Sequence, residues 1–219
     1  IDFAVHSLKD LPTRLPDGIV LACVPEREDP RDAFVSSKAK TLADLPAGAT
    51  VGTASLRRQA QVLFARRDLK VSVLRGNVDT RLTKLEAGAA DATFLALAGL
   101  KRMGLASRAT SLVDPFESPP AACQGAIAIT ARTDDARVLE ALGLCQDKNA
   151  RLEIEAERAF LDALDGSCRT PIGALARVGG AQMTFIGETL TPDGSQRWRR
   201  EATIELTGDT LRAVRKLGH

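Results

Sequence analysis

The spacing of apolar positions changes along this chain and predicts strands alternating with helices. Short runs that contain β-branched residues predict strands, because β-branched residues favour that conformation. The clearest helix is Ser55–Arg67, whose apolar residues recur at i, i+4, i+7 and i+8. A second helix is expected at Val78–Ala87. The strands predicted in this part are Ile19–Val24, Ala33–Ser36, Thr50–Gly52, Lys70–Leu74, Asp91–Leu97 and Ala126–Thr130. This order is typical of α/β units.

The pattern changes after residue 147. A long helix, Asn149–Leu164, precedes strands at Ala174–Val178, Met183–Glu188 and Arg199–Leu206, and a last helix follows from Asp209. Strands that follow one another without helices indicate an antiparallel α+β unit. Proline-bounded polar breaks at residues 25–30 and 115–120 are typical of domain crossings. We therefore expect three domains, residues 1–25 with 121–146, residues 30–118, and residues 147–219.

Composition narrows the class of protein. The chain has 219 residues, 44% of them hydrophobic and 26% charged, as in ordinary globular proteins. A net charge of +2 is too small to favour nucleic acid as a partner, and no apolar run is long enough to cross a bilayer. The four cysteines are widely spread without a C-x-x-C pair, which favours a reducing cytoplasm and argues against a metal site. The first residues resemble the interior of a strand, so we expect an N-terminal segment to be missing. We expect a monomer.

Cationic residues follow three predicted strands of the second domain. Arg57 and Arg58 fall in the first turn of the helix after Gly52, where the free N–H groups of a helix start attract anions. Arg75, with Arg81 in the next helix, and Arg102 repeat the arrangement. Because ligands of open α/β sheets bind at the carboxyl ends of strands, we expect an anion-binding site there. A solvated charged surface is the alternative for each residue taken alone.

Two further positions are candidates for chemistry. Lys9 and Asp10 follow the first apolar run, and Asp10 would stay ionised if it faced the arginines. Taken alone, Lys-Asp before Leu-Pro is more typical of a turn. Cys168 lies between a Gly-Ser pair and Arg169, an electropositive setting in which a thiolate becomes reactive. The alternative is a small buried hydrophobic residue.

Together these segments resemble the porphobilinogen deaminase (hydroxymethylbilane synthase) family of tetrapyrrole biosynthesis. The resemblance covers nearly the whole chain in family order, and its long motifs are specific. The matching stretches are AVHSLKDLP (Ala4–Pro12), EREDPRDAFVS (Glu26–Ser36), VGTASLRRQAQ (Val51–Gln61), LRGNVDTRL (Leu74–Leu82), LALAGLKRMGL (Leu95–Leu105) and AERAFLDALDGSCRTPIG (Ala156–Gly173).

The resemblance implies a fold and a set of roles. The fold would be two α/β lobes like those of periplasmic binding proteins, followed by a small α+β domain. Cys168 would carry a covalent dipyrromethane cofactor, Asp10 would be the catalytic aspartate, and Arg102 would bind substrate. The residues matching positions that hold the acid side chains of the cofactor are Lys9, Thr53, Ser55, Arg57, Arg58, Arg75 and Arg81.

The implied reaction explains the excess of arginine. Four porphobilinogen molecules would lose ammonia and join head to tail on the cofactor before hydroxymethylbilane is released, and every ring brings two carboxylates. The chain departs from the family pattern at Ser167 and Cys123, where the family usually has glycine. A two-lobed protein that only binds an anionic small molecule is the second hypothesis, and a nucleic-acid-binding protein is the third.

Overall fold

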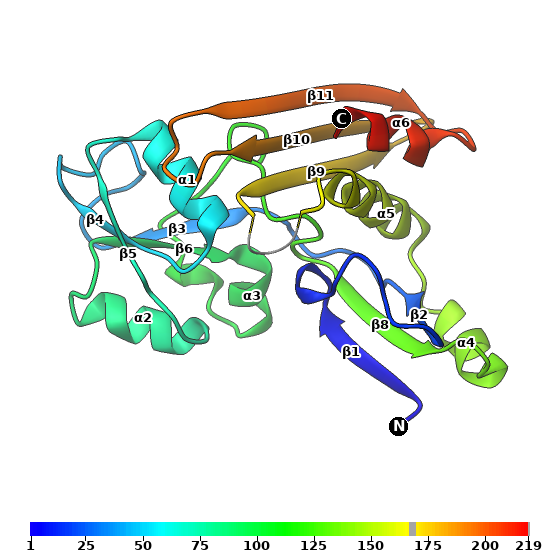
Figure 1. The fold of residues 1–219 in the computed structure, drawn as a ribbon. Coiled ribbons are helices and arrows are strands. Elements are labelled where there is room, and N and C mark those ends of the chain that lie inside the picture. The colour runs from blue at the N-terminus through cyan, green and yellow to red at the C-terminus, as the bar shows by residue number, and fades with distance from the viewer. Residues whose placement is uncertain (167–169, 219) are drawn as a thin grey trace.

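The computed structural model describes residues 1–166 and 170–218, and these form three sheets with helices around them (Figure 1). The first sheet is antiparallel, with strand order β1-β8-β2. It consists of β1 (Phe3–Ser7), β8 (Ile127–Arg132) and β2 (Ile19–Cys23). Its middle strand returns from a distant part of the sequence. The first unit therefore combines the beginning of the chain with residues after 125. Helix α4 (Ala136–Gly143) packs against it.

The second sheet has five strands in the order β5-β4-β6-β3-β7. It consists of β5 (Lys70–Ser72), β4 (Thr50–Gly52), β6 (Ala92–Ala96), β3 (Asp32–Ser36) and β7 (Ser111–Leu112). Strand β4 is parallel to β5 and β6, whereas β3 is antiparallel to β6 and to β7. The start of β3 consequently lies at the same edge as the ends of β4, β5 and β6.

Helices cover the two faces of this sheet unequally. Helix α2 (Val78–Glu86) and helix α3 (Leu97–Arg102) pack on the face that carries Ala33, Val35 and Leu95. On the other face, helix α1 (Leu56–Ala65) contributes Val62 to the core. Two short 3-10 turns, η1 (Leu8–Asp10) and η2 (Ala106–Arg108), complete the first two units.

The third sheet is an antiparallel meander in the order β11-β10-β9. It consists of β9 (Ile172–Gly179), β10 (Gln182–Leu190) and β11 (Arg197–Glu205). Helix α5 (Lys148–Ala163) packs against β9 and β10, and helix α6 (Thr210–Leu217) packs on α5. Figure 1 shows this sheet lying across the other two units, with α1 at one end and α5 beneath it. The predicted mixed α/β fold with a C-terminal α+β unit is confirmed.

Some local predictions were incomplete. The predicted strand Asp91–Leu97 ends one residue early, because α3 starts directly at Leu97 without a turn. The expected sequence of strand end, glycine turn and arginine therefore does not occur at Arg102, which ends α3 instead. Helix α4 and strand β7 were not predicted.

A buried ion cluster fixes the third unit against the segments that connect the first two. We call Arg27, Glu153 and Glu157 the glutamate-rich cluster. The Arg27 guanidinium donates to Glu157 Oε1 at 2.7 Å and Oε2 at 3.1 Å, and to Glu153 at 3.3 Å. Glu157 is fully buried and also accepts the backbone N–H groups of Cys123 and Ala176. Every carboxylate oxygen of Glu157 is thus occupied by donors, as a buried charge requires.

Candidate active site

The loop after β4 sets the position of the two adjacent arginines. Strand β4 ends at Gly52, where a Cβ atom would approach Leu74 and Ala90 to about 3 Å, so only glycine packs there without displacement. The Thr53 hydroxyl then accepts the Ser55 N–H at 3.1 Å, and Ser55 caps α1 by accepting the Arg58 N–H. This sequence of turn and cap starts the helix one residue before Arg57.

Both arginines are buried and share one carboxylate, that of Asp32 at the start of β3. We call Asp32, Arg57 and Arg58 the arginine-rich cluster. Arg58 donates to Asp32 through Nη2 at 2.7 Å and Nε at 3.3 Å, and Arg57 through Nη2 at 2.9 Å. Burial alone would raise the pKa of Asp32, but the two guanidinium groups hold that pKa well below its usual range. Asp32 is therefore a permanent anion between two cations.

The hydrogen-bond donors and the positive charge of the arginine-rich cluster are not fully matched by acceptors and negative charge among the described residues. Arg57 also donates to Gln61 and to the Pro119 carbonyl, and Arg58 to the Phe94 carbonyl. Among the described residues, each guanidinium then keeps two of its five N–H donors without a partner, and one of these is the buried Nε of Arg57. One negative charge against two positive charges also leaves a net positive charge.

Gln124 ties this cluster to the segment between β7 and β8. Its amide nitrogen donates to Asp32 Oδ1 at 2.8 Å and to the Pro30 carbonyl at 2.7 Å. Gln124 is almost completely buried. The arginine-rich cluster therefore lies where the first and second units meet.

A cavity of about 220 Å³ opens beside the cluster. It brings four basic side chains together with Asp10, whose carboxylate has no hydrogen bond or ion pair within residues 1–166 and 170–218. The lining residues are Lys9, Asp10, Ala54, Ser55, Arg57, Arg58, Arg81, Ala121, Ala122, Gln124, Leu161, Thr170 and Ile172. All three units contribute, so the cavity is a junction site.

Crowding of cations changes the titration of Lys9. Burial, and next the charge of Arg58, lower the pKa of Lys9 to about 8. The pKa of Arg81 is lowered in the same way, by burial and by Arg58. In both cases burial is the larger cause, and the positive charge of Arg58 adds to it. The arrangement suits a ligand with several carboxylates.

The structure brings together most of the residues singled out in the sequence. Lys9, Asp10, Ser55, Arg57, Arg58 and Arg81 all line the cavity, and Thr53 is buried directly behind Ser55. Arg75 does not line it and is exposed. Arg102 is also outside the cavity and donates to the Gly125 carbonyl at 2.8 Å. Cys168 lies outside the described residues, although Thr170, two positions later, lines the cavity.

Sequence reasoning did not identify Asp32 or Gln124 as site residues. Asp32 lies in the stretch Glu26–Ser36 that carried the family resemblance, and Gln124 directly follows Cys123.

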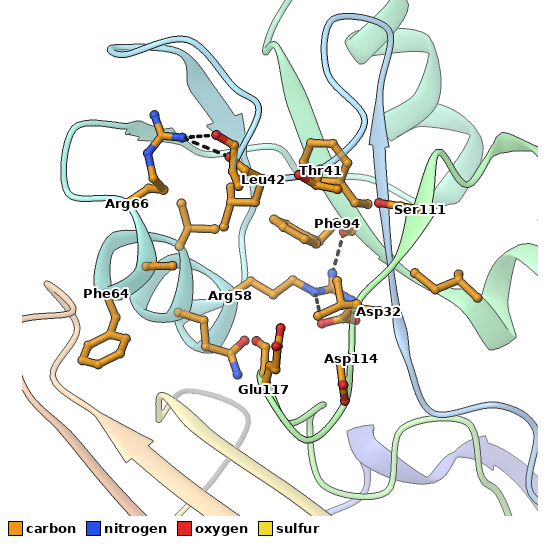
Figure 2. A pocket seen from close by; sticks show the side chains of 18 of the residues that line it. Asp32, Thr41, Leu42, Arg58, Phe64, Arg66, Phe94, Ser111, Asp114 and Glu117 are labelled. Atoms are coloured by element: carbon orange, nitrogen blue, oxygen red, sulfur yellow. Dashed lines mark hydrogen bonds and ion pairs between the residues drawn. The ribbon is translucent and has the colours of Figure 1, made fainter.

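A second cavity, of about 570 Å³, shares Arg58 with the first and also reaches Asp32 (Figure 2). Among the described residues, no group of three His, Cys, Asp or Glu side chains is placed to hold a metal ion, and no helix has the length and hydropathy of a membrane span.

Comparison with family models gives two matches that follow one another along the chain. The model described as "Porphobilinogen deaminase, dipyromethane cofactor binding domain" matches residues 1–140, and "Porphobilinogen deaminase, C-terminal domain" matches residues 151–217. Curated relatives agree. The porphobilinogen deaminase of Caulobacter vibrioides (strain NA1000 / CB15N) is 55% identical over 221 residues, with 100% of this chain and 68% of the relative covered. That of Nitrobacter hamburgensis is 54% identical, with 99% and 70% covered.

Solved structures give weaker matches. A nutrient binding protein from Burkholderia cenocepacia bound to methionine aligns with a TM-score of 0.41 and 19% identity, covering 57% of this chain and 61% of that chain. The methionine-binding protein MetQ aligns with a TM-score of 0.42 and 15% identity, covering 62% and 64%.

Proposed function

This chain belongs to the porphobilinogen deaminase family, and on that premise we propose that the 220 Å³ cavity at the junction of its three units is the active site. The family is a transferase family of tetrapyrrole biosynthesis that polymerises porphobilinogen with a dipyrromethane cofactor. The observation that carries the proposal is that four basic residues and Asp10 line one cavity.

The chemistry of the donor set fits the cofactor. A dipyrromethane built from two porphobilinogen units carries acetate and propionate groups, and the cavity offers unused N–H donors on Arg57 and Arg58 together with Lys9 and Arg81. Arginine holds carboxylates through two parallel hydrogen bonds, so it suits these groups better than lysine does. Ser55 provides a hydroxyl at the same wall. Thr53 lies behind Ser55 and positions it, because the Thr53 hydroxyl accepts the Ser55 backbone N–H.

When bound, the dipyrromethane supplies the pyrrole ring onto which substrate units are joined. Asp10 provides the complementary group, because a carboxylate without a protein partner can accept the N–H of a pyrrole. It also stabilises the positive charge that develops as ammonia leaves porphobilinogen. The surrounding cations keep the carboxylates of the substrate in place. Loss of such a preorganised charge typically slows a reaction on the order of 10²–10³-fold.

We also propose Cys168 as the attachment point of the cofactor. Thr170 and Leu161, which lie on either side of this residue in the sequence, both line the cavity. The roles of Arg75 as a cofactor-binding residue and Arg102 as a substrate-binding residue have less support, because neither lines the cavity. Arg102 lies at the carbonyl of Gly125, close in sequence to the cavity residue Gln124.

The sheets support the proposed domain boundaries. Residues 1–25 with 121–146 contain the β1-β8-β2 sheet, residues 30–118 contain the five-stranded sheet, and residues 147–219 contain the β9–β11 sheet. We further propose a cytoplasmic monomer that acts on porphobilinogen without a nucleic-acid partner. The small net charge and the wide spacing of the cysteines support these points, and Cys23, Cys123 and Cys145 are unpaired.

The proposal is tested with Asp10→Asn and Cys168→Ser, with Asp17→Asn as an exposed control in the same unit. We expect Asp10→Asn to retain the covalent mass of two linked pyrroles but to lose turnover on the order of 10²–10³-fold. Cys168→Ser should lack the added mass, which intact-protein mass spectrometry measures directly. Full turnover in Asp10→Asn, or an unchanged added mass in Cys168→Ser, would refute the assignment of that residue.

A further inference from the structure

One face of the five-stranded sheet is only partly covered by helix. Phe34 of β3 and Phe94 of β6 are paired in register on this face, with ring centroids 5.3 Å apart. Helix α1 packs toward β5, and among the described residues no helix makes an extensive contact with β3 or β7. The 570 Å³ cavity occupies this place, with Val62 and Leu42 completing an apolar floor (Figure 2). Its volume is in the range of small-molecule sites, about 300–1,000 Å³.

The basic side chains of this cavity are already engaged. Arg66 donates to Asp68 and to the backbone carbonyls of residues 42, 43 and 45. Arg197 pairs with Glu188 at 2.9 Å and stacks over the Phe64 ring at 5.2 Å. Arg58 is held by Asp32. Within the part of the chain that the structure describes, each basic side chain of the lining therefore already has an acidic partner, although Arg58 shares Asp32 with Arg57.

Two acidic side chains of the lining, unlike the basic ones, have no ion-pair partner among the described residues. Asp114 and Glu117 are exposed, and neither makes an ion pair within residues 1–166 and 170–218. Among the described residues, the one hydrogen bond to either side chain is donated by the Phe116 N–H to Asp114. Figure 2 shows both on the same side of the cavity, close to the Arg58–Asp32 pair. The cavity thus combines an aromatic, apolar floor with unpaired negative charge at its edge.

We propose that this cavity binds a small apolar cation, such as an aromatic ammonium compound, and that its occupancy is transmitted to the 220 Å³ cavity through Arg58 and Asp32. Aromatic faces and carboxylates both attract a positive charge, whereas the floor accepts a hydrocarbon body. An anionic ligand is disfavoured because each cation of the lining already has an acidic partner, whereas Asp114 and Glu117 have none among the described residues. The site is separate from the reaction assigned to the family.

The link between the cavities is a single ion pair. Arg58 lines both cavities, and Asp32 lines the larger cavity while it also holds Arg57 and Gln124 of the smaller one. A ligand that shifts the Arg58 guanidinium must change its bonds to Asp32, because the two share two hydrogen bonds. Binding in the larger cavity then alters the hydrogen bond between Asp32 and Arg57 in the smaller one.

The test uses the whole chain and three probes of similar shape, phenethylamine, 2-phenylethanol and 3-phenylpropanoate. Affinities are measured by NMR titration. We expect the amine to bind about three- to tenfold tighter than the alcohol, as partly screened ion pairs allow, and the acid to bind weakest. Equal affinities for the three probes, or no binding of the amine, would overturn the proposal.

Variants locate the site. Asp114→Asn combined with Glu117→Gln should abolish the preference for the amine, whereas the exposed Glu140→Gln on α4 should leave it intact. Ala65→Trp should block binding by filling the cavity, and the charge variants serve if this protein does not fold. An amine preference that survives in the double variant contradicts the assigned site.

The coupling has its own readout in the arginine side chains. The Nε–H signal of Arg58, assigned by comparison with Arg58→Lys, should shift on addition of phenethylamine, and the shift should be lost in the double variant. A probe that binds without moving this signal would refute transmission through Arg58. This measurement needs no turnover, so its failure is distinct from failure of the proposed active site.

Discussion

The two buried ion clusters both pair arginine with carboxylates, but they differ in how completely their charges and donors are used. In the glutamate-rich cluster, Arg27 and the nearby Arg177 face Glu153 and Glu157, so the charges balance. Backbone N–H groups occupy the remaining carboxylate positions. In the arginine-rich cluster, two arginines share Asp32, donors remain unused, and a cavity adjoins.

This difference separates a structural cluster from a binding site. A buried charge without a partner costs several kcal/mol, so a cluster that serves only the fold is expected to be saturated. An imbalance that persists beside a cavity indicates a ligand that completes it. Burial of arginine alone does not distinguish the two cases, since Arg27 and Arg57 are buried to a similar extent.

The largest effect is expected from breaking the saturated cluster. Glu157→Gln removes the charge opposite Arg27 and places an amide N–H₂ against N–H donors, so we expect the free energy of unfolding to fall by about 3–5 kcal/mol. Urea denaturation measures the loss. Glu155→Gln, on the same helix but partly exposed and paired only with Arg151, is the control and should cost less than about 1 kcal/mol. Similar losses for both would contradict the comparison.

Asp32→Asn should have a smaller effect that an added anion partly reverses. The substitution leaves Arg57 and Arg58 without their shared carboxylate, and we expect a loss of about 3 kcal/mol, the lower end of the range for a broken buried pair. Because the cavity admits ligands, citrate should raise the melting temperature of Asp32→Asn more than that of the wild type or of Glu157→Gln. Equal increases in all three proteins would show that the arginine-rich cluster is closed to anions.

Arg81→Gln tests whether the cavity or the sequence pattern better identifies cofactor-binding residues. Arg81 lines the cavity, so its loss should weaken carboxylate binding by about 1.5–3 kcal/mol, roughly tenfold or more. The control is Arg75→Gln, which the sequence placed in the same role but which is exposed outside the cavity. The fraction of protein carrying the dipyrromethane mass after expression measures the effect. An equal loss in both variants would favour the sequence prediction.

The sequence predicted elements well where a local signal marks their ends. Gly52 and Ser55 mark the end of β4 and the cap of α1, and both were placed to within a residue. Helix α3 was missed because Ala96 provides no side-chain cap and the apolar run of β6 continues into the helix. Local patterning therefore identified strongly bounded elements and failed where two elements of similar composition are joined directly.

The candidate site was predicted only in part, for a reason of topology. Only residues after strand ends were considered, because ligands of open α/β sheets bind at the carboxyl ends of strands. Because β3 is antiparallel to β6, Asp32 at its start pairs with Ala96 at the end of β6 and lies at the same edge. Arg75 follows β5, which is the edge strand of the sheet, and this places it away from the cavity. No signal within a single segment specifies either relation.

Titration of Lys9 should cause two smaller pH-dependent effects of opposite sign, one on the affinity for an anion and one on the stability of the fold. Its pKa of about 8 is below the ordinary value, so its charge is lost as the pH rises through about 8 and affinity for an anion should fall by roughly 1 kcal/mol. Without ligand, the unfolded chain holds the Lys9 proton up to higher pH, so stability should rise as the pH increases above about 8. Lys9→Gln should remove both trends, which calorimetric titration and urea denaturation measure separately. Parallel trends in wild type and variant would exclude Lys9 as their source.

The smallest effect concerns Cys123, which lies between β7 and β8 and whose backbone N–H donates to Glu157. Its φ of 64° lies in the left-handed region, where a side chain is strained by about 1–2 kcal/mol and glycine is not. Its thiol is buried, and burial raises the pKa, so the residue packs as a neutral side chain. Cys123→Gly exchanges this packing for relief of strain and should change stability by no more than about 1 kcal/mol. Cys123→Ala keeps the strain and loses the sulfur, so it should be the less stable variant in urea denaturation. The reverse order would mean that the thiol, rather than the backbone conformation, determines the stability of this connection.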